Sequence, residues 1–253
     1  MRLAGTARPA HMLYSALWSA LDWVFPPNCG GCQKTGERWC TDCQSHLVLL
    51  GHAICPVCGE PQAEPTPCPG CRAEPPHYQM IRSAAEYSGP LRQAIHHLKY
   101  QNDIGLGEVL SKHLIELYNQ FKWNVDCIAP IPLSTARIRE RGYNQSSLLA
   151  RPLAYAIQKP YRPNILRRTK ETRSQVGLSA RERAQNVAGA FTATPELIRG
   201  NVVLLIDDVT TTGSTINACA QALIASGASA VYGMTLARAV LKPEAEDQPH
   251  NSI

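Results

Sequence analysis

The sequence predicts an α/β protein with a mainly parallel sheet and flanking helices, preceded by a small cysteine-rich module. From residue 77 to residue 240, short apolar runs alternate with helical spacing of apolar residues, which is the pattern of a parallel sheet covered on both faces. Eight of the ten cysteines instead fall between residues 29 and 71, in a stretch rich in proline and glycine. With 253 residues, the chain is long enough for one sizeable domain and one small appendage.

Residues 1–28 are expected to contain an N-terminal amphipathic helix, because Leu13, Leu17 and Leu21 recur at helical spacing. The apolar run is interrupted by Asp22 and is shorter than the roughly 20 residues that cross a bilayer. No cleavage site of a signal peptide follows it. We therefore expect no stable membrane insertion, with contact of this helix at a membrane surface as the less favoured alternative.

Four Cys-x-x-Cys pairs predict a double zinc-ribbon module over residues 29–76. Eight thiolates are enough for two closed tetrahedral sites, and such sites leave no position open for catalysis. Loops of seven and nine residues favour one site from the first four cysteines and one from the last four. Two structural Zn²⁺ ions would then replace the missing apolar core, in a reducing compartment. The expected metal ligands are Cys29, Cys32, Cys40, Cys43, Cys55, Cys58, Cys68 and Cys71.

The elements of the α/β region follow from their apolar patterns. Strands are expected at residues 81–87, 125–131, 202–206 and 231–237. Helices are expected at residues 90–98, 106–121, 144–156 and 214–226. The polar and charged stretch 167–185 is predicted to be a mobile loop that can close over a site. The polar tail 241–253 is predicted to be disordered.

Two acids, Asp207 and Asp208, directly follow the apolar run 202–206. Ligands of open α/β sheets bind at the carboxyl ends of the strands, so these acids are expected in a ligand site. A carboxylate pair can accept hydrogen bonds from the 2′ and 3′ hydroxyls of a ribose, and Mg²⁺ would offset the repulsion between the acids. The alternative, a solvated turn without a ligand, is less favoured because of the residues that follow.

Residues 210–215 offer backbone N–H groups, small hydroxyls and Gly213 immediately before a helix. The N-terminus of a helix attracts anions, so this loop suits a phosphate. Thr212 or Ser214 could instead serve only as a helix cap. We favour the phosphate site, because the acids, the hydroxyl-rich loop and the cap coincide at the end of one strand.

This segment resembles the signature of type I phosphoribosyltransferases, an apolar strand followed by two acids and a Thr/Gly-rich loop. The resemblance implies a type I phosphoribosyltransferase-like domain over residues 77–240 that binds phosphoribosyl diphosphate (PRPP) with Mg²⁺. The acids would hold the ribose, and the loop would surround the 5′-phosphate. Thr210 departs from the family pattern, which more often has an apolar residue there. The implied PRPP-binding residues are Asp207, Asp208, Thr210, Thr211, Thr212, Gly213, Ser214 and Thr215.

A second resemblance covers nearly the whole chain, from the N-terminal cysteines to Ala237. Its motifs are Arg-Glu-Arg-Gly-Tyr-Asn-Gln at 139–145, Arg168-Thr169 with Gln175, Leu178 and Arg181, Asn186-Val187, and Gly-Ala-Phe at 189–191. They resemble the ComF/GntX group. The group implies a cytoplasmic bacterial protein that supports DNA uptake and use in natural transformation. Its implied partners are single-stranded DNA and a DNA-uptake helicase or another competence protein.

The formal net charge is only +5, but positive charge is concentrated between Arg137 and Arg183, where twelve Arg or Lys face three Glu. This concentration favours an anionic ligand. Arg137, Arg139 and Arg141 follow a predicted strand at a position resembling the pyrophosphate-binding loop of phosphoribosyltransferases. Guanidinium groups can bind a diphosphate through two parallel hydrogen bonds. For any one of the three, a solvated surface charge is an equally good interpretation.

Lys170 and Arg173 lie in the predicted mobile loop and are the candidate catalytic residues. Positive donors there would stabilise the charge that develops on a leaving diphosphate. The same charges could follow a nucleic-acid backbone, although few aromatic residues are interleaved with them. Two functions therefore stay open. The protein either transfers a phosphoribosyl group to an unknown acceptor or serves as a non-catalytic DNA- or protein-binding adaptor.

Overall fold

The computed structural model describes residues 26–51, 53–170 and 180–240 of the chain. The helix expected within residues 1–28 falls almost entirely outside these ranges, as do the tail 241–253 and residues 171–179 of the predicted loop. Within the described ranges, no helix combines the length and the apolar character that a bilayer span requires.

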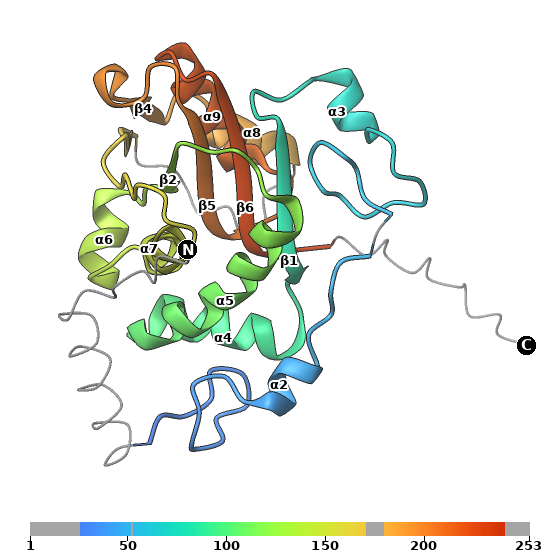
Figure 1. Ribbon diagram of the computed structural model, residues 1–253, viewed down its shortest axis with the longest axis vertical. Coiled ribbons are helices and arrows are strands. Elements are labelled where there is room, and N and C mark those ends of the chain that lie inside the picture. Colours follow the sequence, from blue (N-terminus) through green and yellow to red (C-terminus); the bar gives the residue numbers. More distant parts are fainter. Residues whose placement is uncertain (1–25, 52, 171–179, 241–253) are drawn as a thin grey trace, which may run out of the picture.

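Four parallel strands form the central sheet in the order β1-β6-β5-β2 (Figure 1). The strands are β1 (Met80–Glu86), β2 (Cys127–Pro130), β5 (Val202–Thr210) and β6 (Ala230–Arg238). Each neighbouring pair is parallel, so the carboxyl ends of all four strands lie at the same end of the sheet. The predicted α/β class with a mainly parallel sheet is confirmed.

Strand β5 is longer than the sequence predicted. Its apolar run ends at Ile206, but residues beyond it keep pairing with β6, with Asp207 opposite Thr235 and Thr210 opposite Arg238. The apolar run marked only the part of the strand that is buried on both faces. The two acids therefore lie inside the strand and not after it, which corrects their expected position.

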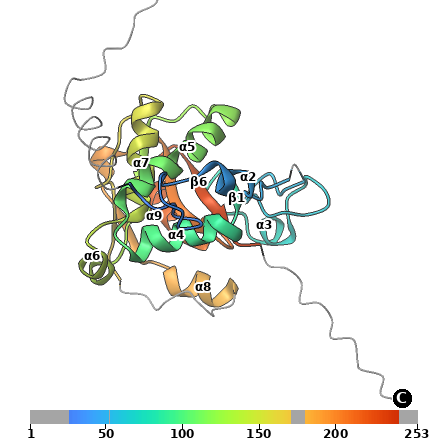
Figure 2. The same cartoon turned by 90° about the horizontal axis from the view of Figure 1, so that it is seen from below.

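Helices cover both faces of the sheet (Figure 1, Figure 2). On one face lie α5 (Ile104–Phe121) and α7 (Gln145–Ala156), with α4 (Gly89–Tyr100) packed against α5. On the other face lie α9 (Ser214–Ala225) and, against it, α8 (Ala180–Val187). The chain thus forms the three layers that the alternating pattern indicated.

Several short elements complete the described part. The cysteine-rich segment contains α2 (Thr41–Ser45) and α3 (Pro69–Ala73), and a 3-10 helix occupies Pro195–Leu197. The three arginines that follow β2 lie on a short helix, α6 (Thr135–Arg141). Ser134 caps the start of α6, and Gly142 ends it in the left-handed conformation with φ +79°.

The stretch 167–185 is not a loop at either end, contrary to the prediction. Strand β3 (Leu166–Arg168) pairs in antiparallel fashion with β4 (Phe191–Ala193), and α8 begins at Ala180. The apolar anchors of these elements, Leu166 and Val187, are buried but lie just outside the polar stretch. The prediction considered only the polar residues 167–185 and therefore missed both anchors.

Both edges of the sheet are paired with irregular chain. Along β1, the N–H of Ile81 donates to the carbonyl of Val57 at 2.8 Å, and the N–H of Glu86 donates to Val48 at 2.8 Å. Along β2, Ile128 exchanges hydrogen bonds with the chain at Pro160 and Arg162. The cysteine-rich segment therefore pairs with the β1 edge of the sheet, and residues near 160–162 pair with the β2 edge.

Candidate functional site

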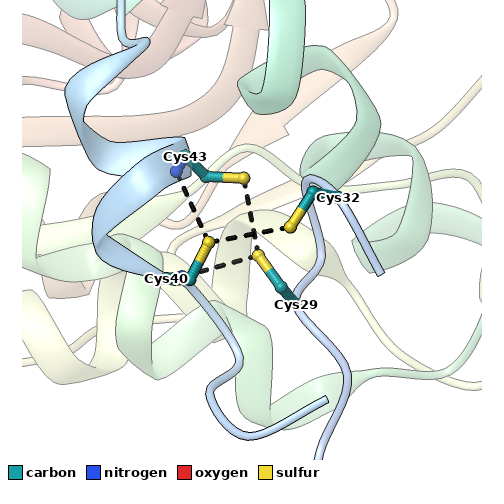
Figure 3. A group of neighbouring side chains, drawn as sticks. All are labelled: Cys29, Cys32, Cys40 and Cys43. Atoms are coloured by element: carbon teal, nitrogen blue, oxygen red, sulfur yellow. Dashed lines mark hydrogen bonds between the residues drawn. The ribbon is translucent and has the colours of Figure 1, made fainter. Parts of the chain in front are cut away.

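The first four cysteines converge on one point (Figure 3). Their Sγ atoms lie within 4.8 Å of one another, and the Sγ atoms of Cys29 and Cys43, like those of Cys32 and Cys40, are 3.6 Å apart. A tetrahedral Zn²⁺ with bonds of about 2.3 Å would place its sulfur ligands roughly 3.8 Å apart. The backbone N–H of Cys43 also points to the Sγ of Cys40, at 3.4 Å, as expected for a metal-binding thiolate.

The last four cysteines form a second cluster with the same geometry. Cys55, Cys58, Cys68 and Cys71 also have all Sγ atoms within 4.8 Å of one another. The Sγ atoms of Cys58 and Cys68 are 3.6 Å apart, and the N–H of Cys68 points to the Sγ of Cys55 at 3.3 Å. Two four-cysteine clusters in sequential pairing are thus present, and their donor set fits two structural Zn²⁺ ions.

The two clusters join different hydrophobic cores. Cys29, Cys43 and Trp39 pack into the core under α4, α5 and α7. Cys55 and Cys58 pack into the core on the α9 face of the sheet. Each cluster therefore stabilises the α/β domain through the apolar residues that it buries.

The two acids of β5 lie in a network of polar side chains from neighbouring helices. Ser146 donates to Oδ1 of Asp207 at 2.9 Å, and Gln145 donates to Oδ1 of Asp208 at 3.0 Å. The ammonium group of Lys99, from α4, forms an ion pair with Oδ2 of Asp208. Asp208 is only 3% exposed, whereas Asp207 is half-buried. The two neighbouring acids are therefore held in different environments.

These environments move the two pKa values in opposite directions. Burial, together with the charge of Asp208, raises the pKa of Asp207 to about 7. Burial alone would also raise the pKa of Asp208, but the charge of Lys99 and its hydrogen bond outweigh burial and hold that pKa below the ordinary value. Asp208 is thus a fixed anion with its own cation, and Asp207 can change its charge near neutral pH.

The loop after β5 brings small polar groups to the start of α9. Gly213 is the N-cap residue of α9 and has a φ of +81°. Because it is a glycine, no side chain caps the helix at this position. The hydroxyls of Thr212 and Ser214 are 2.6 Å apart and hydrogen-bonded to each other. Thr211 and Thr215 are half-buried, whereas Thr210 is 4% exposed and still part of the strand. We use the name 211–215 loop for residues 211–213, which connect β5 to α9, together with the first two residues of α9; Thr210 is not part of it.

The three arginines of α6 have different surroundings. Arg141 donates a hydrogen bond to Gln145, the residue that holds Asp208, and its guanidinium carbon lies 5.1 Å from the ring centre of Tyr100. Arg137 is half-buried, and its N–H completes the cap at Ser134. Arg139 is exposed. Only Arg141 is linked to the acids by the contacts of the described residues.

The two candidate catalytic residues lie at the boundary of the described chain. Lys170 follows β3 and is exposed, with Nζ 3.4 Å from where a Cβ on Gly189 would stand. Arg173 lies outside the described residues. Their role stays a prediction.

Four residues of this region were not predicted from the sequence. Gln145 belongs to the motif at 139–145, and Ser146 follows it, but no role had been assigned to either. Lys99 lies 109 positions before its partner Asp208, and nothing near it in the sequence indicates that partner. Arg238, at the end of β6, donates to the carbonyl of Thr211 at 2.7 Å. A basic residue directly after a buried strand was the signal that could have indicated Arg238.

One family model and several curated proteins match this chain. Residues 20–72 match a family described as a double zinc ribbon domain. The chain is 35% identical over 206 residues to the DNA utilization protein YhgH of Escherichia coli strain K12, which covers 79% of this chain and 89% of that protein. It is 32% identical over 221 residues to competence protein F of Haemophilus influenzae, covering 79% and 96%. It is 27% identical over 213 residues to competence protein ComFC of Bacillus subtilis, covering 81% and 86%.

Among solved structures, the chain is similar in part to adenine phosphoribosyltransferase from Thermoanaerobacter pseudethanolicus. The identity is 16% and the TM-score is 0.36, with coverage of 55% of this chain and 84% of that one. A glutamine PRPP amidotransferase from B. subtilis gives 17% identity and a TM-score of 0.39, covering 55% and 30%.

Proposed function

Because the chain belongs to the ComF/YhgH family of DNA utilization and competence proteins, we propose that it binds PRPP at the carboxyl end of β5. The observation that carries this proposal is the meeting of two features at one strand end. Two adjacent acids lie near the end of the strand, and a hydroxyl-rich loop leads from that strand to the start of a helix. A ribose 5′-phosphate needs carboxylate acceptors for its hydroxyls and hydrogen-bond donors for its phosphate.

The two acids would have different roles in ribose binding. Asp208 already has Lys99 and Gln145 as partners, so it fixes the position of the strand end. Asp207 is more exposed and is the carboxylate that ribose hydroxyls would reach. Binding by hydroxyl donors favours the ionised form of Asp207, so PRPP affinity would increase as the pH rises through about 7.

The 211–215 loop would hold the 5′-phosphate. The N–H groups in the first turn of α9 point toward this loop, and the helix dipole favours an anion there. The hydroxyls of Thr212 and Ser214, which now bond each other, can turn toward phosphate oxygens.

Magnesium is part of this proposal. Carboxylate oxygens are suitable ligands for Mg²⁺, and the ion neutralises diphosphate charge when it is bound. Lys99 already neutralises Asp208, so Asp207 is the side chain that would face a hydrated Mg²⁺ carried by the diphosphate.

The positive residues suit a transfer of the phosphoribosyl group. In such a step, a nucleophile of the acceptor bonds to C1 as the C1–O bond breaks, and the electron pair leaves with the pyrophosphate. Arg137, Arg139 and Arg141 would bind the pyrophosphate, and Lys170 and Arg173 would stabilise its developing charge. The acceptor gives up its proton to solvent or to a base.

The names of the relatives favour a second candidate, an adaptor that binds PRPP or a nucleotide without turnover. These relatives are called DNA utilization and competence proteins. Single-stranded DNA and a DNA-uptake helicase or another cytoplasmic competence protein would then be the partners. Tyr100 is 61% exposed beside Arg141, and an aromatic ring next to a cation is suited to stacking on a base.

The first test is calorimetric titration of Mg²⁺-PRPP into the wild type and Asp207→Asn. Asp207→Asn leaves the ion pair of Lys99 and Asp208 in place, so it removes the carboxylate without leaving a buried charge unpaired. Asp126→Asn is the matched control, because Asp126 caps the opposite end of β5 by accepting from the N–H of Val202 at 2.7 Å. Saturable binding that is lost in Asp207→Asn and kept in Asp126→Asn is the expected result.

A folded wild type that does not bind PRPP would refute the proposed site. If PRPP binds, release of pyrophosphate with a panel of acceptors decides between enzyme and adaptor. Single-stranded DNA binding that weakens steeply with salt would support the adaptor.

A further inference from the structure

Arg238 joins two parts of the chain that are far apart in sequence. It is the last residue of β6 and is completely buried. Its Nη1 donates to Oε2 of Glu60 at 2.6 Å and to the carbonyl of Thr211 at 2.7 Å. Its Nη2 donates to the carbonyl of Cys58. One guanidinium thus bonds the second cysteine cluster and the first residue of the 211–215 loop.

A buried guanidinium must keep these partners. Removing an arginine from water is costly unless its charge is paired and its N–H groups are bonded. Glu60, in the turn formed by residues 55–60, provides the paired charge. The positions of that turn and of the loop are therefore linked through one group.

Close packing strengthens this link. Gly59 has φ +75°, and a Cβ on it would lie 2.8 Å from the carbonyl oxygen of Ile81. On the loop side, a Cβ on Gly213 would lie 3.0 Å from Cδ1 of Ile81 and 3.1 Å from the hydroxyl of Tyr78. Ile81 therefore lies close to both segments, which adds packing to the hydrogen bonds of Arg238.

The first cysteine cluster has a different attachment. It packs against the α4 and α5 face, where Arg38 bonds Asp103 at 2.7 Å. A Cβ on Gly30 would meet the side chain of Leu106 at 2.6 Å. These contacts involve the start of α5 and not the 211–215 loop, so the first cluster provides an internal control.

We propose that Arg238 is a positioning residue through which Zn²⁺ at the second cluster holds the 211–215 loop in its phosphate-binding conformation. The metal fixes the backbone of Cys58, the turn fixes Glu60, and Arg238 carries that constraint to Thr211. Because coupling between two sites is reciprocal, a ligand in the loop also retains the second Zn²⁺. The first half of the proposal is the effect of Zn²⁺ on the loop, and the second half is the effect of a loop ligand on the Zn²⁺. Only the second half rests on the proposed PRPP site.

The first half is tested without ligand by hydrogen–deuterium exchange on the full chain with both Zn²⁺ ions bound. The variants are Glu60→Gln and Arg238→Lys, with Arg38→Gln as the matched control at the first cluster. We expect exchange of the 210–217 amides to rise by about fivefold or more in Glu60→Gln and Arg238→Lys. In Arg38→Gln it should be unchanged. Wild-type exchange at 210–217 in a zinc-loaded Glu60→Gln would overturn the proposal, even if Arg238→Lys fails to fold.

The second half is tested by the rate at which each Zn²⁺ passes to a chromophoric chelator, with and without Mg²⁺-PRPP. Mass spectrometry of alkylated thiols identifies the emptied cluster. We expect PRPP to slow release from the second cluster by about fivefold or more, leave the first unchanged, and lose this effect in Glu60→Gln. A purely structural role would change the melting temperature of Glu60→Gln but not the selective effect of PRPP.

The two proposals can fail separately. Absence of PRPP binding to the wild type refutes the proposed site, whereas the exchange experiment still decides the link through Arg238. Binding of PRPP with equal effects on both clusters, or with no effect on either, refutes the coupling and leaves the site.

Discussion

Lys99 reaches from α4 to the buried carboxylate of Asp208, and this pair determines how the site is built. The side chain of Asp208 is 4% exposed and that of Lys99 is 21% exposed. A pair in this position contributes little net stability when complete, but removal of one partner leaves an uncompensated buried charge.

Lys99→Met should therefore lower the free energy of unfolding by about 3 kcal/mol or more. The double variant Lys99→Met/Asp208→Asn removes both charges and should recover most of this loss. Urea unfolding of the wild type and the variants measures both effects. Equal stability of Lys99→Met and the wild type would contradict this prediction, because it would mean that water solvates the Asp208 carboxylate.

Asp207 predicts a pH dependence of stability. Burial and the neighbouring Asp208 raise its pKa from an ordinary 3.8 to about 7, so between these values the folded state holds a proton that the unfolded state has lost. The contribution of Asp207 to the free energy of unfolding therefore decreases as the pH rises from about 4 to about 7. The pKa of Asp208 is shifted below its ordinary value and lies outside this window.

Asp207→Asn should flatten this dependence. At pH 8 we expect the variant to melt roughly 3–6 °C above the wild type, and the difference to shrink toward pH 4. Melting curves from pH 4 to pH 8 measure it, with Asp126→Asn as the control that should follow the wild type. Parallel profiles for Asp207→Asn and the wild type would show that Asp207 ionises normally.

At the scale of elements, the junction of β5 and α9 depends on Gly213. Its φ of +81° disfavours any side chain, and a Cβ would meet Tyr78 and Ile81 at about the closest distances that real contacts show. Gly200 has a similar φ of +76°, but a Cβ there would meet nothing within 4 Å. Alanine at Gly200 would therefore introduce backbone strain alone, whereas alanine at Gly213 would introduce strain and close packing contacts.

Gly200→Ala should cost about 1 kcal/mol of stability from backbone strain alone, whereas Gly213→Ala should cost about 2–3 kcal/mol and weaken PRPP binding. Chemical unfolding and calorimetry measure the two effects. Similar losses in both variants would show that Tyr78 and Ile81 move aside freely.

Local patterns were sufficient to predict most elements. The strands and helices of the α/β region lie within a few residues of their apolar runs, because those runs face the cores. The sequential pairing of the cysteines and the family resemblance were also confirmed. The length of β5 was missed because pairing with β6 continues past Ile206, where the side chains become polar. The ends of 167–185 were missed because their buried anchors lie outside it.

The partners of the acids could not be predicted in the same way. Asp207 and Asp208 were visible as adjacent acids after an apolar run, but Lys99, Gln145 and Ser146 come from two helices more than 60 positions away. Such contacts depend on how α4 and α7 pack against the sheet. Arg238 was missed for the same reason, since its acid lies 178 positions away.

For the whole molecule, the division of the clusters between two cores predicts how metal loss acts. Cys32 is an exposed ligand of the first cluster, so Cys32→Ser removes a ligand while leaving the buried residues in place. We expect the variant to retain one Zn²⁺ instead of two and to lose on the order of 5 kcal/mol of stability. Metal analysis and thermal unfolding check this. Two retained Zn²⁺ ions and an unchanged melting temperature would contradict it.

The pairing of β1 with the cysteine-rich segment also bears on solubility. Open strand edges recruit other chains, and here the edge of β1 is closed by backbone at Val48 and at Val57, which lies within the 55–60 turn between two metal ligands. A chain stripped of its second Zn²⁺ would expose the N–H and C=O groups of β1 that face Val57 while the rest of the sheet is still folded. Zinc starvation should therefore first produce aggregates that grow through β1, before the domain itself unfolds.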